Sequence, residues 1–349
     1  PVTFRAAGTS LSGQAITDSV LIVAGKNWEK YSVGENAETI TLQPGIIGQR
    51  VNEILAPYGR TFTPDPASKK SAMVGGIVMN NASGMNCGTH ANSDRMLLSA
   101  RLILADGTIL DTGDEESRKS FLHFHPSFIS QIEQLRDKVN ADPSLVERIR
   151  YKYGIKNVTG LNLLPLVRFT DPFDIITHLL VGSEGTLAFG SQFTMRTGHL
   201  YPQSASAMLY FRTMADACNA VKAMKSQPVF SAEILDRKSL SSVGDTTGPN
   251  LTAVLTETKA DTPEELQANI SAIEKALQPF SLYVPAHFTS NPQEYARYWA
   301  IRSGIFPSVG GTRPMGTTVI IEDIAFHIEN LTEATLDLEQ MLLKHGYDD

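Results

Sequence analysis

The stretch that decides the fold is RAAGTSLSGQ, from Arg5 to Gln14, near the start of the chain. Gly8 and Gly13 can adopt backbone angles that other residues avoid, and the small hydroxyl residues between them leave their amides unobstructed. Successive amides of this kind form a concave site that suits a phosphate oxygen. The alternative, a plain Gly/Ser connector between two strands, stays open on these ten residues alone.

Two common nucleotide-binding loops do not fit this stretch. Gly8 and Gly13 match the glycines of GxxxxGK[ST], but Gln14 and Ala15 stand where the lysine and the hydroxyl residue belong. A mononucleotide's phosphates and its Mg²⁺ would therefore lack their usual partners. The dinucleotide fingerprint GxGxxG is also absent. A phosphate site here must belong to another class of protein.

The composition indicates an ordinary globular protein and argues against a nucleic-acid partner. The chain has 349 residues, 42% of them hydrophobic, and a net charge of −7, which allows about two domains. The acidic balance and the lack of a Lys/Arg run disfavour a nucleic-acid partner. Apolar runs are far shorter than the ~20 residues of a membrane-spanning helix, and no signal peptide precedes the first motif. We expect a soluble, cytoplasmic protein.

The cysteine count restricts the redox chemistry. Cys87 and Cys218 are the only cysteines, too few for a disulfide framework or for the four thiolates of an iron–sulfur cluster. Any redox step therefore needs an organic cofactor. The chain starts at Pro1, without a methionine, and enters the glycine loop within five residues. We expect it to be a piece of a longer protein.

Apolar patterns in the first half predict short strands and a helical segment. An Asp-Gly turn at Asp106–Gly107 predicts a hairpin, and Pro143 suits the start of a helix. Residues from Asp114 to about Lys156 have helical spacing and read as an insertion between strands. The predicted strands are 1–5, 19–23, 38–43, 97–104, 108–110 and 192–196, with a helix at 47–55.

A second informative block runs from Thr63 to His90 and reads TPDPASKKSAMVGGIVMNNASGMNCGTH. Two prolines stiffen its entry, and Gly75-Gly76 opens a helix-like apolar run. Asn80 to Gly84 is then a loop of small polar residues. Small residues at this density let a planar or phosphorylated ligand approach the main chain closely.

Beyond about His199, strands alternate with helices of about 12 residues, which predicts an α+β layer with helices on one side of a sheet. Thr262 is the expected N-cap of a helix to about Leu277, with Glu265 three positions later. The other predicted elements are strands at 207–211, 231–235 and 251–257, a helix at 215–225 and a final helix at 331–345 that stops at Gly346.

Together these blocks resemble the FAD-binding flavoenzymes of the vanillyl-alcohol oxidase (PCMH-type) fold, in the branch of D-lactate dehydrogenases, glycolate oxidase flavin subunits and D-2-hydroxyglutarate dehydrogenases. The resemblance rests on RAAGTSLSGQ, on QPG…PDPAS…GG…NNASG, on ADGTI at 105–109 and on LLVGSEGTLA at 179–188. It implies an α+β protein: a two-part FAD-binding domain over 1–198, incomplete at its N-terminus and with the helical insertion at about 114–156, then a substrate or cap domain over 199–349, incomplete at its C-terminus, with an antiparallel sheet and helices on one side.

The resemblance also implies which residues contact FAD. The first loop would hold the pyrophosphate, the second block would line the diphosphate and the isoalloxazine ring, and the third would close near the adenine or ribityl portion. The implied residues are Arg5, Ala7, Gly8, Thr9, Ser10, Ser12, Gly13, Pro64, Asp65, Ser68, Gly75, Gly76, Asn80, Ser83, Gly84, Ile176, Gly182, Glu184 and Gly185. Some of these glycines can instead serve strand turns alone.

On the substrate side, the resemblance places an arginine at Arg302 in WAIRSGIFP, and a guanidinium matches a carboxylate with two prongs. A surface ion pair is the alternative for this residue. Arg313 could assist, and Glu322 and Asp323 lie where the family has acidic residues near its pocket. The family often has proline where this chain has His327.

The implied reaction is oxidation of a D-2-hydroxyacid of the lactate, glycolate or 2-hydroxyglutarate type. An arginine would hold the carboxylate over the flavin, a histidine would take the hydroxyl proton, and hydride would pass from C2 to flavin N5. The family's HxxxGNxH motif, which supplies this base and in some members metal ligands, would begin beyond Asp349. A divalent metal is therefore expected only in that segment, and none within this chain. We expect this piece alone to retain FAD weakly and to have little activity.

Electrons would pass on to a quinone, an electron-transfer flavoprotein or an iron–sulfur domain or subunit, which could bring the protein to the membrane periphery. A homodimer is compatible with the sequence. Two other classes stay open: a non-catalytic FAD-binding electron-transfer subunit, and a reductase of the same fold that uses NAD(P)H. The serine acid and glutamate pair of that reductase are not evident.

Overall fold

The computed structural model describes residues 2–10, 13–84, 86–157, 160–245, 247–312, 315 and 324–347. The chain divides into two compact units, Pro1–Leu200 and Tyr201–Asp349, called unit 1 and unit 2 below. Both combine helices with antiparallel sheets, as the predicted α+β class requires. None of the helices in the described ranges is long and apolar enough to cross a membrane.

Unit 1 is built on a five-stranded antiparallel sheet of order β3-β4-β8-β6-β7. Its core combines sheet residues with the inner faces of the helices α1 (Gly48–Leu55), α2 (Val74–Asn80) and α8 (Pro172–Leu179). Ile40 and Leu42 show why β4 is a strand, since these alternate positions are fully buried while their neighbours are not. The strands are β3 Tyr31–Val33, β4 Thr39–Leu42, β6 Leu97–Ile103, β7 Ile109–Asp111 and β8 Phe189–Arg196.

Two smaller strand pairs complete unit 1. β1 (Val2–Arg5) pairs in parallel with β2 (Val20–Val23), so the loop between them returns the chain alongside itself. β5 (Arg60–Thr61) pairs with β9 (Gly198–His199). The predicted hairpin is confirmed: β6 and β7 are joined through Gly107, whose φ of +87° suits the tight turn.

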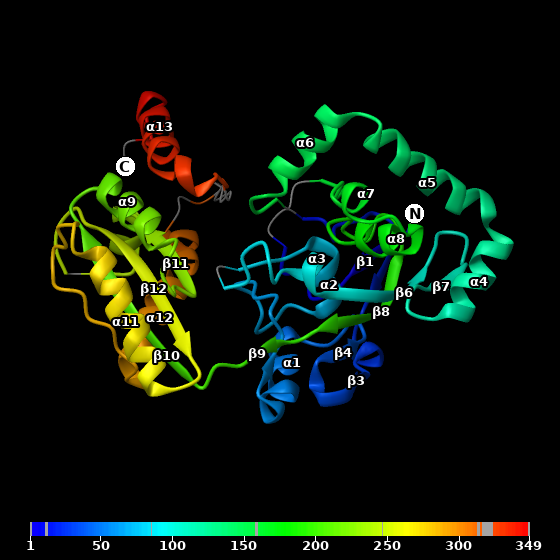
Figure 1. The fold of residues 1–349 in the computed structure, drawn as a ribbon, viewed down its shortest axis with the longest axis horizontal. Helices are drawn as coiled ribbons and strands as arrows, with labels where there is room; N and C mark the ends of the chain where they lie inside the picture. The colour runs from blue at the N-terminus through cyan, green and yellow to red at the C-terminus, as the bar shows by residue number, and fades with distance from the viewer. Residues whose placement is uncertain are drawn as a thin grey trace. The chain divides into compact units, whose positions relative to one another are not determined.

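The helices of unit 1 are α1 Gly48–Leu55, α2 Val74–Asn80, α3 Ser93–Met96, α4 Glu115–Phe124, α5 Pro126–Asn140, α6 Pro143–Lys152, α7 Pro165–Arg168 and α8 Pro172–Leu179. The predicted helical insertion is confirmed as α4 to α6, which run as an arc around the outside of the unit (Figure 1). Pro143 occupies the first turn of α6, and the Asp142 side chain caps its amides.

Unit 2 contains a three-stranded antiparallel sheet of order β10-β12-β11. Thr262 caps α11 as predicted, through a hydrogen bond from the Glu265 amide. The strands are β10 Gln203–Phe211, β11 Ser231–Leu235 and β12 Thr252–Ala260, and the helices are α9 Met214–Met224, α10 Arg237–Ser242, α11 Pro263–Leu277, α12 Pro292–Thr312 and α13 Leu331–Lys344.

Helices cover both faces of the unit 2 sheet, which corrects the expectation of helices on one side. Leu209 of β10 packs with α9 and α11, whereas the next residue, Tyr210, packs with α10 and α12. The side chains on both faces of β10 are buried from Ala205 to Phe211. In the sequence, a strand that is buried on both faces is a continuous apolar run. It lacks the alternation of apolar and polar residues that marks a strand with one face in solvent.

Candidate functional site

The RAAGTSLSGQ loop connects β1 to β2 in unit 1. Gly8 and Gly13 have φ of +68° and +73°, the left-handed region that favours glycine. The Arg5 guanidinium lies against Gly8, because a Cβ built there would come 2.5 Å from Nε. Ser10 donates a hydrogen bond to the Gln14 side chain, and Thr9 beside it is exposed, while Ala7 is partly buried. Ser12 lies outside the described residues.

The first loop meets the start of α2, the helix that Gly75 and Gly76 open. A Cβ on Gly76 would lie 3.3 Å from the Ala6 side chain, and one on Gly75 would lie 2.6 Å from Cβ of Pro44. The Gly75 amide also donates to the Pro44 carbonyl at 2.9 Å. These close approaches explain why the sequence has two glycines at a helix start.

The PDPAS segment packs against the NNASG loop. A Cβ on Gly84 would lie 1.7 Å from the Asp65 carbonyl oxygen, so the two backbones touch. The Asp65 carboxylate accepts from Asn86 Nδ2 at 2.6 Å and pairs with Lys69 at 2.5 Å. Among the neighbouring predicted residues, Pro64 is buried, and Ser68 and Ser83 are partly buried.

The GSEGT turn closes onto the end of α2. The amides of Gly182 and Glu184 both donate to the Met79 carbonyl, at 2.8 and 3.0 Å, and the Asn80 side chain donates to the Glu184 carboxylate. Desolvation raises the pKa of Glu184, and the hydrogen bond from Asn80 partly offsets this rise. Gly185 lies beside Phe4 of β1, since a Cβ on it would be 3.9 Å from that side chain.

Three segments that are distant in sequence, the first loop, the block from PDPAS to NNASG and the GSEGT turn, are therefore joined by direct contacts within unit 1. The first loop touches α2, the GSEGT turn touches both β1 and the end of α2, and Gly84 touches Asp65. Ile176 differs from the other predicted residues: it lies inside α8 with a side chain that is 6% exposed, and it belongs to the core.

A buried polar cluster behind the NNASG loop is absent from the sequence-based predictions. The carboxylate of Asp94 accepts from Arg168 Nη1 at 2.6 Å and from Asn162 Nδ2 at 2.9 Å. The Asp94 amide donates to Asn81 Oδ1 at 3.1 Å, which fixes Asn81 in a left-handed conformation at the end of α2. Arg168 and Asn162 follow Asp94 by 74 and 68 positions, so no local pattern reveals the cluster.

Two buried groups beside these blocks titrate abnormally. Burial lowers the pKa of His178 in α8, whose ring nitrogens lie 2.9 Å from the Asp174 carbonyl and 3.2 Å from the Leu97 carbonyl. A neutral imidazole can donate to only one of these carbonyls. Burial also raises the pKa of the Cys87 thiol, which contacts the Gly84 carbonyl at 3.4 Å. Cys87 is thus a neutral, structural thiol.

In unit 2, Arg302 lies on α12 and donates from Nε to Glu233 Oε2 of β11 at 2.8 Å. Its side chain is 23% exposed. Arg313, Glu322 and Asp323, the other residues predicted on the substrate side, lie outside the described residues.

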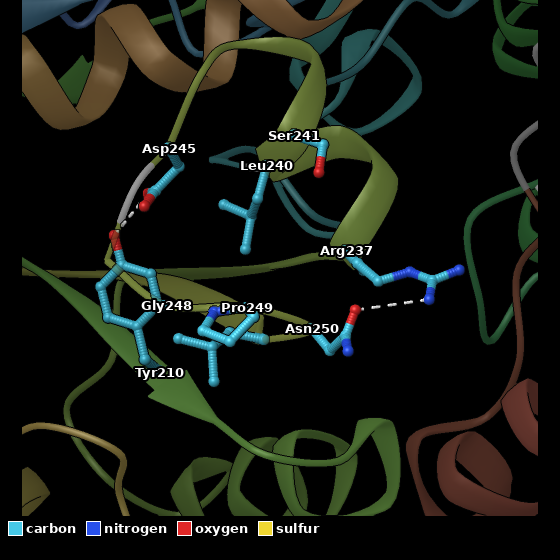
Figure 2. Close-up of a pocket in the computed structure, with 9 residues that line it drawn as sticks. Tyr210, Arg237, Leu240, Ser241, Asp245, Gly248, Pro249 and Asn250 are labelled. Carbon is cyan, nitrogen blue, oxygen red and sulfur yellow. Dashed lines mark hydrogen bonds between the residues drawn. The ribbon is translucent and has the colours of Figure 1, made fainter.

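Unit 2 also has an open pocket of about 580 Å³ next to α10. Figure 2 shows the Tyr210 hydroxyl donating to Asp245, and Arg237 close to the Asn250 side chain, at 2.7 and 3.5 Å. Burial raises the pKa of Tyr210 to about 12, so it stays a hydrogen-bond donor. Leu240 is among the apolar lining residues. None of the predicted residues that the structure describes lines this pocket.

Comparison with known protein families assigns both units. Residues 1–113 match the model of the FAD binding domain, and residues 201–348 match the C-terminal domain of FAD linked oxidases. The chain thus combines an FAD binding domain with the C-terminal domain of FAD linked oxidases. The family resemblance read from the sequence is thereby confirmed. The match to the FAD binding domain covers the first loop, the PDPAS segment and the NNASG loop.

The chain is similar to curated proteins that are named as dehydrogenases and as an oxidase subunit. It is 22% identical to D-2-hydroxyglutarate dehydrogenase of Haemophilus influenzae over 98% of this chain and 36% of the relative. It is 27% identical to D-lactate dehydrogenase of Archaeoglobus fulgidus over 63% of this chain and 38% of that protein. It is 31% identical to glycolate oxidase subunit GlcD of Escherichia coli over 33% of this chain and 23% of that subunit. The chain thus spans about a third of the length of the relatives it matches.

A solved structure shows the same fold. Alkyldihydroxyacetonephosphate synthase matches with a TM-score of 0.58 at 14% sequence identity, over 89% of this chain and 51% of that chain. At this identity the likeness shows the fold alone. The predicted two-part architecture of an FAD-linked oxidase is confirmed by this match and the two family models.

Proposed function

We propose that the protein is an FAD-dependent oxidoreductase that converts a D-2-hydroxyacid of the lactate, glycolate or 2-hydroxyglutarate type to the 2-oxoacid. Residues 1–198 would bind FAD and residues 199–349 would bind the substrate. When bound, FAD supplies the two-electron oxidation by accepting hydride from C2 at N5. The names of the relatives support the substrate class.

The observation that carries the proposal is that the first loop, the block from PDPAS to NNASG and the GSEGT turn contact one another in unit 1. A dinucleotide with a planar ring needs backbone amides for its pyrophosphate and small residues where its ring approaches the main chain. The first loop has two left-handed glycines and a neighbouring cation, Arg5. Gly76 lets the first loop pack closely against α2 through Ala6, and Gly84 lets the NNASG loop touch the Asp65 backbone. The residues present therefore fit FAD.

The polar groups at the Asn80–Glu184 contact add hydrogen-bonding capacity beside these glycines. We assign Arg5, Gly8 and the hydroxyl residues of the first loop to the pyrophosphate, and Asn80, Ser83 and Gly84 to the flavin end. Glu184 can accept from a ribose or ribityl hydroxyl, because a carboxylate accepts through both oxygens.

Arg302 is the proposed ligand of the substrate carboxylate, with Arg313 as its assistant. A planar guanidinium can hold a carboxylate through two parallel hydrogen bonds, which orients C2 as well as binding it. Glu322 and Asp323 are proposed as further pocket residues. Electrons would leave for an acceptor protein, a quinone or an iron–sulfur partner, since the chain's two cysteines cannot hold a four-thiolate cluster. The relative GlcD is itself an oxidase subunit.

Replacing Arg302 tests the proposal in the full-length protein. We expect Arg302→Met to lower kcat/KM for the best D-2-hydroxyacid by about 100-fold or more, because a charge-assisted bidentate contact is lost. FAD content should stay unchanged. The control is Arg237→Met, which removes an exposed arginine of the same unit. Equal kcat/KM in Arg302→Met and the wild type would exclude Arg302 as the carboxylate ligand.

A further inference from the structure

Three side chains of α12 attach this helix to the unit 2 sheet, and each reaches a different strand. Tyr295 donates to Glu257 of β12. Trp299 Nε1 donates to Ser206 Oγ of β10 at 3.3 Å. Arg302 donates to Glu233 of β11 at 2.8 Å. Positions 295, 299 and 302 follow the i, i+4, i+7 spacing of one helix face. The helix that carries Arg302 is thus positioned by a stripe of polar contacts.

The first of these contacts is deeply buried. Glu257 is 1% exposed, and its carboxylate also lies 3.4 Å from Lys259 Nζ. Burial, together with the charge of Glu257, raises the pKa of Tyr295, so the phenol remains a donor to this carboxylate. A buried carboxylate that lost this donor would be costly. The Tyr295–Glu257 contact therefore fixes the position of α12 along the sheet.

With α12 fixed, Glu233 determines how the Arg302 side chain is oriented. The guanidinium has two edges that can hold a carboxylate: the Nε edge and the edge formed by the two terminal nitrogens. Glu233 occupies Nε. Within the described part of unit 2, no other polar partner of the guanidinium is recorded. Glu233 belongs to strand β11, whose pairing with β12 includes this position, so its carboxylate is held on a rigid element.

We propose that Glu233 is a positioning residue for Arg302, which holds the guanidinium by its Nε edge and leaves the two terminal nitrogens to bind the substrate carboxylate. This inference rests on the proposed function, and it makes the Arg302–Glu233 pair part of the binding site. The ion pair predicted as the alternative for Arg302 and the role in binding are then compatible, because they use different edges of one group.

Two conservative replacements separate positioning from charge. Glu233→Gln keeps the length of the side chain and an oxygen that accepts from Nε, but it removes the charge. Glu233→Asp keeps the charge but is shorter by about 1.5 Å, which would lengthen the 2.8 Å contact beyond hydrogen-bond range. If Glu233 positions Arg302, Glu233→Gln should keep binding of the substrate carboxylate and Glu233→Asp should weaken it. If only the charge of Glu233 matters, Glu233→Gln should weaken binding and Glu233→Asp should keep it.

The test uses the full-length protein with FAD bound. Calorimetry would measure the Kd of oxalate, a non-oxidisable dicarboxylate that resembles a 2-hydroxyacid, and steady-state kinetics would give KM and kcat. We expect Glu233→Asp to raise the Kd of oxalate and KM by about 10-fold, as for a lost hydrogen bond to a charged group. Glu233→Gln should stay within about three-fold of the wild type. Glu329→Asp and Glu329→Gln are the controls, because Glu329 forms an exposed pair with Lys225 in the same unit.

Each outcome decides the question. If the Asp variant binds oxalate as the wild type does, or if Gln weakens binding as much as Asp, the positioning role is wrong. If both variants lower Tm but leave the Kd and KM unchanged, Glu233 is only structural, which also overturns the inference. If the wild type neither binds oxalate nor oxidises any 2-hydroxyacid, the proposed function itself fails. If the wild type binds oxalate, and Glu233→Asp and Glu233→Gln have the same Kd and KM as the wild type, this inference is wrong and the proposed function still stands.

Discussion

Replacing Arg168 with methionine tests whether the buried Asp94 cluster supports the NNASG loop. The Asp94 side chain is 5% exposed, and Arg168 Nη1 lies 2.6 Å from its carboxylate. Methionine fills part of the space but leaves the buried carboxylate with one described side-chain hydrogen-bond donor, Asn162, and with Arg95 Nε at 4.0 Å. Breaking a buried ion pair from one side costs about 3–5 kcal/mol. Because the Arg168 side chain is 20% exposed and water can reach it, we expect about 2–4 kcal/mol.

The assay is thermal unfolding of the full-length protein, together with the Kd of FAD. A loss of 2–4 kcal/mol should lower Tm of the transition that reports unit 1 by roughly 4–16 °C. FAD affinity should fall as well, because Asp94 holds Asn81, the second residue of the NNASG loop. Adding Asp94→Asn to Arg168→Met should recover at least about 1.5 kcal/mol, since the unpaired buried charge is then gone.

The control is Arg50→Met, which removes an arginine from the exposed Arg50–Glu53 pair. Such pairs contribute about 0–1 kcal/mol. If Arg168→Met lowers Tm no more than Arg50→Met does, the Asp94 cluster is not a stabilising element of this site. Strict additivity of Arg168→Met and Asp94→Asn would refute the coupling between them.

The remaining predictions concern backbone packing and pH. Gly84→Ala should destabilise unit 1 by at least about 3 kcal/mol and abolish FAD binding, because its methyl would lie 1.7 Å from the Asp65 carbonyl oxygen. Gly25→Ala is the matched control, since a Cβ there has no heavy atom within 4 Å; equal stability of the two variants in urea titrations would contradict the packing. Burial lowers the pKa of His178, so below the ordinary histidine value of about 6.5 the unfolded chain takes up a proton that the native protein refuses. His178 should thus contribute its full stability above about pH 6.5, and the free energy of unfolding should fall by up to about 1.4 kcal/mol per pH unit below it. The variant His178→Gln should lack this part of the dependence of the free energy of unfolding on pH. If the free energy of unfolding of His178→Gln depends on pH as that of the wild type does, His178 is not the source of this dependence.

Local patterns in the sequence predicted most elements of both units. The hairpin through Gly107, the cap at Thr262 and the helix start at Pro143 depend on residues within a few positions of one another. The first loop, the GG helix start and the GSEGT turn were identified in the same way, as short stretches with a shared chemical character. What the sequence could not show is that Gly185 meets Phe4, that Gly76 meets Ala6 and that Gly84 meets Asp65.

The features that escaped prediction depend on long-range contacts. Arg302 is 69 positions from Glu233, and Arg168 is 74 positions from Asp94, so sequence spacing carries no signal for either pair. The second helical layer of unit 2 was missed because a strand buried on both faces, such as β10, gives no alternation from which its two faces can be told apart. Tertiary packing decides these features.

The central claim is that the protein uses bound FAD to oxidise a D-2-hydroxyacid. The most direct measurement is the absorption spectrum of the full-length protein, purified with FAD and then mixed without oxygen with D-lactate, glycolate or D-2-hydroxyglutarate. We predict one FAD per chain and bleaching of the flavin by at least one of these acids, with no bleaching by NADH or NADPH. A protein that fails to bind FAD, or whose bound flavin is reduced by NADPH and by none of the hydroxyacids, would contradict the account.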